Sequence, residues 1–95
     1  MGINICVQGL DGTEEPSWDS IRFAGDRELG GLFGELETER HNIGSEFEPD
    51  FVYRPKDISA WRSAVAAREW PNPGRPVELL DLLERRPDLW VYISY

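Results

Sequence analysis

The sequence predicts a small α+β domain in which a mainly antiparallel sheet carries about three helices packed on one face. Two patterns lead to this fold class. Runs of apolar residues typical of strands lie near both ends of the chain, and apolar residues with helical spacing lie between them. The chain has 95 residues, which is the length of one domain with one modest core. Residues 1–95 are therefore expected to form a single unit.

The first predicted strand rests on Ile3, Ile5 and Val7, which alternate with polar residues. Residues 18–24 alternate again after a polar, acidic loop, so we expect these two runs to form a hairpin. The last run, residues 89–95, is rich in aromatic and β-branched residues, which favour strands. Because the first and last strands are apolar, we expect them to be neighbours at the centre of the sheet.

The first predicted helix begins at Asp26, because the residues that follow place one apolar stripe on a helix: Leu29, Leu32, Phe33 and Leu36. The opposite face carries Gly30, Gly31 and Gly34, which lower the helix propensity. Two interpretations stay open, a weak helix with a bare back face or a smooth face against which another backbone packs. His41 is expected to cap the end of this helix.

Residues 44–55 predict an edge strand or an extended arm, because aromatic and acidic residues alternate there and Pro49 cannot donate to a sheet. A second helix is expected after Asp57, a good N-cap, with Ile58, Trp61 and Val65 on its buried side. A third helix is expected from Pro76 to the residues before Pro87, with its leucines facing inward.

The charge is concentrated in the first half of the chain. Its 18 acidic and 10 basic residues give a net charge of −8, and residues 1–50 hold twelve of the acids but three of the bases. Such a field repels phosphate, so we expect no nucleic-acid partner. We expect no membrane association either, because no run of about 18 apolar residues exists. The single cysteine, Cys6, excludes an internal disulfide and is typical of a cytoplasmic protein.

The residue types leave no trace of catalysis, a bound metal or a cofactor. A zinc site needs three or four nitrogen or sulfur ligands, whereas the chain offers one cysteine and one histidine, Cys6 and His41. Nothing in the sequence brings these two residues together for nucleophilic catalysis. The acidic loop at residues 11–19 lacks the spacing of a calcium loop. An enzyme is not excluded, but we expect no catalytic residue, no metal and no cofactor.

Two features favour a binding function. The first is an acidic surface, which we expect as a stripe on the first helix that continues along the extended arm: Glu28, Glu35, Glu39, Glu46, Glu48 and Asp50. The second is Trp70, which lies beside Pro71 in a predicted turn and is expected to be exposed. A charge run can also serve solubility alone.

The leading hypothesis is a protein-interaction module that binds a partner protein with a basic surface. Small acidic bacterial immunity proteins and inhibitors offer an analogy of architecture, not of motifs. Two alternatives stay open. One is a small ligand-binding or catalytic domain with its site between residues 46–55 and the helices. The other is a structural subunit of a homo-oligomer, for example a homodimer through the edge segment 46–53.

Overall fold

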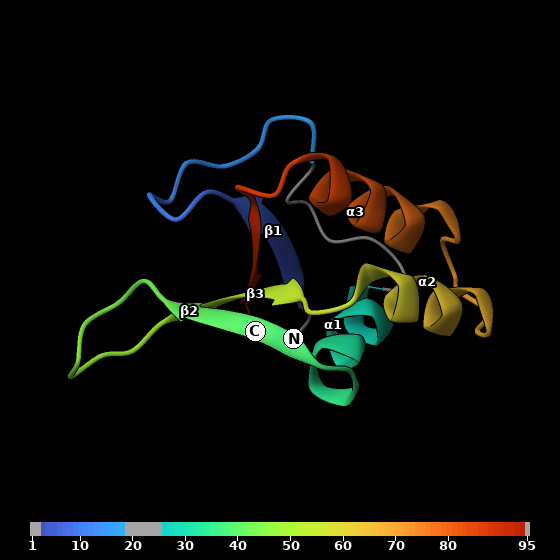
Figure 1. Ribbon diagram of the computed structural model, residues 1–95, viewed down its shortest axis with the longest axis horizontal. Coiled ribbons are helices and arrows are strands. Elements are labelled where there is room, and N and C mark those ends of the chain that lie inside the picture. The colour runs from blue at the N-terminus through green and yellow to red at the C-terminus, as the bar shows by residue number, and fades with distance from the viewer. Residues whose placement is uncertain (1–2, 19–25, 95) are drawn as a thin grey trace.

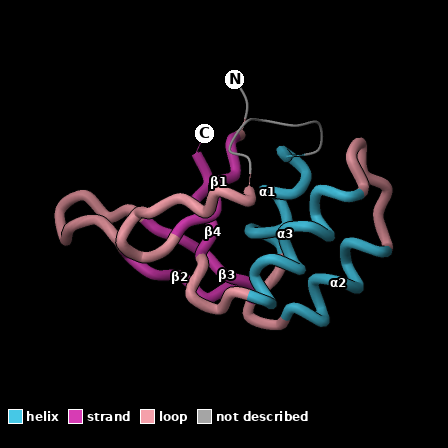
Figure 2. The backbone as a smooth tube through the Cα atoms, turned by 90° about the horizontal axis from the view of Figure 1, so that it is seen from above, coloured by secondary structure: helices cyan, strands magenta, loops and turns pink. Residues whose placement is uncertain are grey.

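The computed structural model describes residues 3–18 and 26–94, which form one antiparallel sheet with three helices on one side of it (Figures 1 and 2). The strands are β1 (Asn4–Gln8), β2 (Thr38–Asn42), β3 (Phe51–Pro55) and β4 (Trp90–Ser94). The helices are α1 (Asp26–Glu35), α2 (Ile58–Ala66) and α3 (Gly74–Arg85). The predicted α+β class is confirmed.

The strand order is β1-β4-β3-β2, so the first and last strands of the chain are neighbours, as predicted. They pair along their whole length, from Asn4 opposite Ser94 to Gln8 opposite Trp90. We expected both strands at the sheet centre. β4 is interior, whereas β1 is the outermost described strand on its side.

The loop after β1 turns back and covers the outer edge of this strand. The indole nitrogen of Trp18 donates to the carbonyl of Ile5 at 2.8 Å, and the backbone N–H of Glu15 donates to the carbonyl of Val7 at 2.8 Å. Two edge carbonyls are thereby satisfied, which limits pairing with a foreign strand. The strand expected at residues 18–24 lies, apart from Trp18, outside the described residues.

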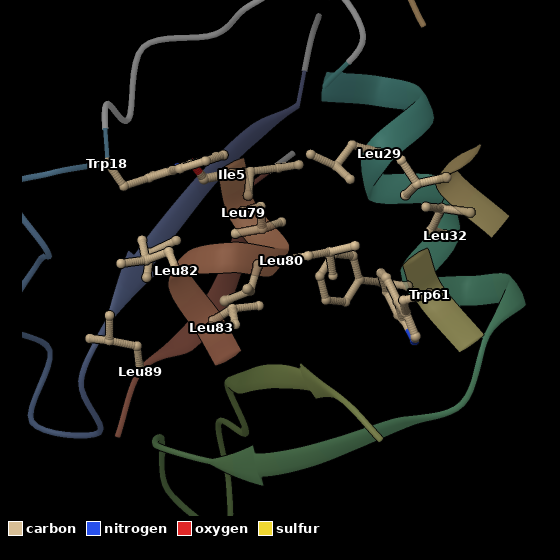
Figure 3. Packing of buried hydrophobic residues seen from close by; sticks show 14 residues of the cluster. Ile5, Trp18, Leu29, Leu32, Trp61, Leu79, Leu80, Leu82, Leu83 and Leu89 are labelled. Carbon is tan, nitrogen blue, oxygen red and sulfur yellow. The ribbon is translucent and has the colours of Figure 1, made fainter. Parts of the chain in front are cut away.

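The core fills the space between the sheet and the helices (Figure 3). Leu79, Leu80 and Leu83 of α3 are at most 1% exposed and lie at its centre. Ile5 of β1 approaches them from the sheet, and the apolar face of α1 lies beside Trp61. The predicted cap of α2 is confirmed, because the Asp57 carboxylate accepts from the N–H groups of Ser59 and Ala60.

Arg54 connects β3 to the far end of α3. Its guanidinium donates to the carbonyls of Leu83 (2.9 Å), Arg86 (3.4 Å) and Leu89. The carbonyls at a helix C-terminus lack partners within the helix and carry partial negative charge, so a cation stabilises them. Burial lowers the pKa of the Arg54 guanidinium below its ordinary value.

Strand β2 was not expected from the sequence. Helix α1 ends at Glu35, so His41 lies within an edge strand and does not cap the helix. Glu39 likewise lies on β2, not in an acidic stripe on α1. Four of the five residues of β2 are exposed, so the strand carries no apolar alternation that could reveal it.

The expectation of an edge strand over residues 44–55 is wrong in two respects. Only residues 51–55 form a strand, and this strand, β3, is interior because it lies between β4 and β2. Residues 43–50 form a loop, so Phe47 does not share a sheet face with Phe51. The alternation over residues 44–50 was therefore not a strand signal. Gly44 and Pro49 are residues that favour a turn.

The glycines of α1 form a largely bare face. A Cβ at Gly31 or Gly34 would meet nothing within 4 Å, whereas a Cβ at Gly30 would lie 3.5 Å from the side chain of Ile3. Within residues 3–18 and 26–94, no other backbone packs closely on these three glycines, which agrees with the first interpretation of the glycine pattern. Helix α3 begins at Gly74, two residues before the predicted start at Pro76.

A chain that ends at Asp88 is expected not to fold. It lacks β4, so β1 and β3 lose their common neighbour and Val91, which is 0% exposed, leaves the core. Burial of one large apolar side chain contributes about 1.5–3 kcal/mol to the free energy of unfolding, which totals roughly 5–15 kcal/mol for a small domain. Urea unfolding followed by tryptophan fluorescence measures this, with Ser94→Ala in the full chain as the control. A cooperative transition in the shortened chain would show that β4 is dispensable.

Candidate functional site

The β2–β3 hairpin projects from one end of the molecule, and residues 43–50 form the loop between its two strands (Figures 1 and 2). Its base is closed by the N–H of Ile43, which donates to the carbonyl of Asp50 at 2.7 Å. The Asn42 side chain holds the loop from inside. Its Oδ1 accepts from the N–H groups of Gly44 (2.9 Å) and Asp50 (3.0 Å), and its Nδ2 donates to the carbonyl of Ser45 (3.4 Å).

The outermost turn spans residues 45–48, which we call the hairpin tip. The Ser45 N–H donates to the carbonyl of Glu48 at 3.1 Å, and the Glu48 N–H donates to Ser45 Oγ at 2.9 Å. Gly44 is required just before this turn. A Cβ there would collide with the carbonyl oxygen of Glu48 and would lie 2.8 Å from the backbone nitrogen of Asp50.

The hairpin tip presents one aromatic ring between two carboxylates. Phe47 is 92% exposed, more than Leu10 or Val77, the other exposed large apolar residues in the part of the chain that the structure describes. Glu46 and Glu48 flank it and form no ion pair within residues 3–18 and 26–94. A solvent-exposed aromatic ring beside carboxylates without ion-pair partners is typical of a residue that anchors a protein contact.

The other acidic residues predicted for partner binding are arranged differently. Glu35, at the end of α1, forms an ion pair with Arg68, and Glu39 of β2 lies opposite Arg54. Glu28 is exposed on α1 and has no ion pair in the described part of the chain. The structure therefore does not form the acidic stripe expected on α1: Glu35 and Glu39 lie beside arginines, and Glu46 and Glu48 lie together on the hairpin tip.

Trp70 belongs to the segment between α2 and α3, at the end of the molecule opposite the hairpin (Figures 1 and 2). Its side chain is half-buried against the core, and its indole nitrogen donates to the carbonyl of Val65 at 2.9 Å. This bond satisfies a carbonyl near the C-terminus of α2. Trp70 thus has a structural role, which corrects the expectation that it is exposed.

The face of the sheet that the helices leave open carries a row of side chains that crosses all four strands. The strand register places Cys6, Tyr92, Val52 and His41 in this row. Neighbouring strands lie about 4.8 Å apart, so Cys6 and His41 are separated by roughly 14 Å and cannot act as a catalytic pair. Burial, and secondarily Glu14, raises the pKa of the Cys6 thiol. Its thiolate, which is the reactive form, is therefore disfavoured.

At the foot of the hairpin, Asp50 interacts with Tyr92 of the same open face. Burial raises the pKa of the Tyr92 hydroxyl, and the Asp50 carboxylate adds to this effect through its charge and a hydrogen bond. On the opposite face, the Arg40 guanidinium lies 4.5 Å from the ring centre of Phe51. These contacts fix the start of β3 and with it the direction of the hairpin.

A groove of about 770 Å³ lies beside this foot, between α1 and the adjoining ends of β3 and β4. Its wall on α1 includes Gly31 and Gly34, and its aromatic lining includes Phe33 and Tyr53. Its charged lining residues among those the structure describes are Arg27 and Asp50. The sequence pointed to Gly31 and Gly34 as a bare face, but it did not indicate that three elements meet there.

In residues 3–18 and 26–94, no group of three or more His, Cys, Asp or Glu residues is placed to hold a metal ion. None of the described helices is both long and apolar enough to cross a membrane.

Asn42→Ala is expected to destabilise the hairpin. It removes one donor and one acceptor that serve three backbone groups, which should cost about 1–2 kcal/mol of unfolding free energy. Asn42→Asp is the matched control, because it keeps the acceptor oxygen and should lose less. Urea unfolding of the two variants measures the difference. An Asn42→Ala variant as stable as the wild type would show that the side chain does not hold the loop.

Comparisons of the chain with protein-family models, with curated proteins and with solved structures found no match.

Proposed function

We propose that this protein is a non-enzymatic interaction module that presents its β2–β3 hairpin to a partner protein with a basic surface. The observation that carries the proposal is the hairpin tip, where Phe47 is 92% exposed between two carboxylates that lack ion-pair partners among the described residues. The tip projects from the body of the protein, so it can reach a concave surface on the partner (Figure 1). Binding would then resemble the way inhibitors cover a basic site.

The charge of the chain supports a basic partner. With a net charge of −8, the protein attracts cationic surfaces over a distance of about 10 Å at 0.1 M salt. Such attraction chiefly accelerates association, whereas packing of apolar anchors chiefly slows dissociation. The hairpin tip combines these two elements, because Glu46 and Glu48 flank the aromatic ring of Phe47.

One observation favours the alternative of a small ligand-binding or catalytic domain. The groove lies between residues 49–53 and α1, close to where the alternative places a site. Its described lining contains no histidine, cysteine or lysine. The hydrogen-bonded residues Asp50 and Tyr92 line it, but the pKa of the Tyr92 hydroxyl is raised, so the phenolate that could act as a base is disfavoured. This function therefore ranks second.

Glu46→Gln combined with Glu48→Gln is expected to slow association with the partner several-fold at low salt and to flatten the salt dependence. Dissociation should change less. The matched control is Glu69→Gln with Glu78→Gln, which changes the net charge equally at exposed positions outside the hairpin. The partner is first isolated by affinity capture, and association rates are then measured by surface plasmon resonance across a salt series.

If the hairpin variant and the control variant bind at the same rate as the wild type, the acidic surface serves solubility only. If the two variants are slowed equally, the effect comes from net charge and the hairpin is not the contact.

A further inference from the structure

Phe47 and the groove are complementary features of the same chain. Phe47 is a large apolar side chain with 92% of its surface in water, and removing the surface of an aromatic ring from water is favourable. The groove of about 770 Å³ lies in the size range of pockets that enclose small ligands, roughly 300–1,000 Å³. Its wall at Gly31 and Gly34 is open, since a Cβ at either residue would meet nothing within 4 Å.

The charged lining of the groove, among the described residues, is one cation, Arg27, and one carboxylate, Asp50, which is hydrogen-bonded to Tyr92. Glu46 and Glu48 flank Phe47 in the chain. Arg27 lines the groove and forms no ion pair with the residues that the structure describes. An aromatic ring that entered the groove from outside would therefore bring a carboxylate toward this guanidinium, and Arg binds carboxylates well because its donors form a planar fork.

The position of the groove suits a two-fold contact. The hairpin leads from its tip at Phe47 to the groove residues Asp50, Phe51 and Tyr53, an offset of about 10–20 Å at the rise of a strand. In a two-fold dimer, residue i of one copy meets residue j of the other and the reverse contact also forms. Two hairpins placed side by side in opposite directions would set each tip against the foot of the other hairpin.

We propose that a second copy of this chain occupies the groove, with Phe47 of each copy inserted in the groove of the other and Glu46 or Glu48 paired with Arg27. The two rings would bury roughly 300–500 Å² of their own surface. The exposed residues of β2 and of the loop would supply the remainder of the about 1,000 Å² that a specific interface needs. The dimer is weak, because each copy carries a net charge of −8, and it requires enough salt to screen charges beyond about 8 Å.

The dimer and the proposed partner use the same hairpin tip, so the two contacts compete. They remain separable by experiment, because the self-association assay contains only this protein. A protein that stays monomeric would overturn the dimer and leave the partner assay unaffected.

Sedimentation velocity of the full chain at about 0.15 M salt, from about 1 μM to about 1 mM protein, tests the proposal. The wild type should dimerise with rising concentration, and Phe47→Ala should weaken the dimer at least about tenfold, because both anchors are lost. Val77→Ala is the matched control, since it truncates an apolar residue that is 43% exposed on α3, and it should behave as the wild type.

Two further variants test the groove and the charge pair. Gly34→Leu fills the groove and should abolish the dimer, whereas Gly34→Ala adds one methyl group to open space and should retain it. Glu48→Arg should weaken the dimer, and adding Arg27→Glu to the same chain should restore it. A wild type that is monomeric at every concentration, or a dimer that survives Phe47→Ala and Gly34→Leu, would overturn the proposal.

Discussion

The structure depends on β4, because this strand joins the two halves of the sheet. It pairs with β1 on one side and with β3 on the other, so the first and last strands of the chain lie next to each other in the sheet. The Arg54 guanidinium fixes the entry to β4, since it donates to the carbonyl of Leu89 and to carbonyls at the end of α3. Pairing β1 with β4 closes the largest loop of the chain, and a large loop costs more conformational entropy to close than a small one. We therefore expect this pairing to form late in folding.

With the body of the protein fixed in this way, the hairpin can project without a core of its own. Its strand β2 is exposed and packs little, but β3 is an interior strand whose Val52 is 0% exposed. The loop is held by Asn42 and by the turn at residues 45–48. A loop ordered before binding loses less entropy when a partner binds, which favours a role as a contact surface.

The elements that could be predicted from the sequence are those in which apolar residues recur with the period of a helix or a strand. Helix α2 with its Asp57 cap and strand β4 at Val91 were anticipated because burial leaves a pattern. Strand β2 could not be predicted because its side chains are exposed and show no apolar alternation. Acidic residues occupy every second position over residues 46–50, as they can in a strand, but this segment forms a loop. The exposure of Phe47 and the groove lined by Arg27 depend on how segments distant in the sequence are arranged in space, and a local sequence pattern does not indicate this arrangement.

Native-state hydrogen exchange of the loop amides, followed by NMR, tests most directly whether the hairpin tip is preorganised. The N–H groups of Gly44, Glu48 and Asp50 donate hydrogen bonds within the loop and should exchange at least about tenfold more slowly than in an unfolded peptide of the same sequence. The amide of Phe47, at the apex, should exchange faster than these three. Exchange of all four amides at the unfolded rate would contradict the account, because the acidic and aromatic side chains would then have no fixed arrangement to offer a partner.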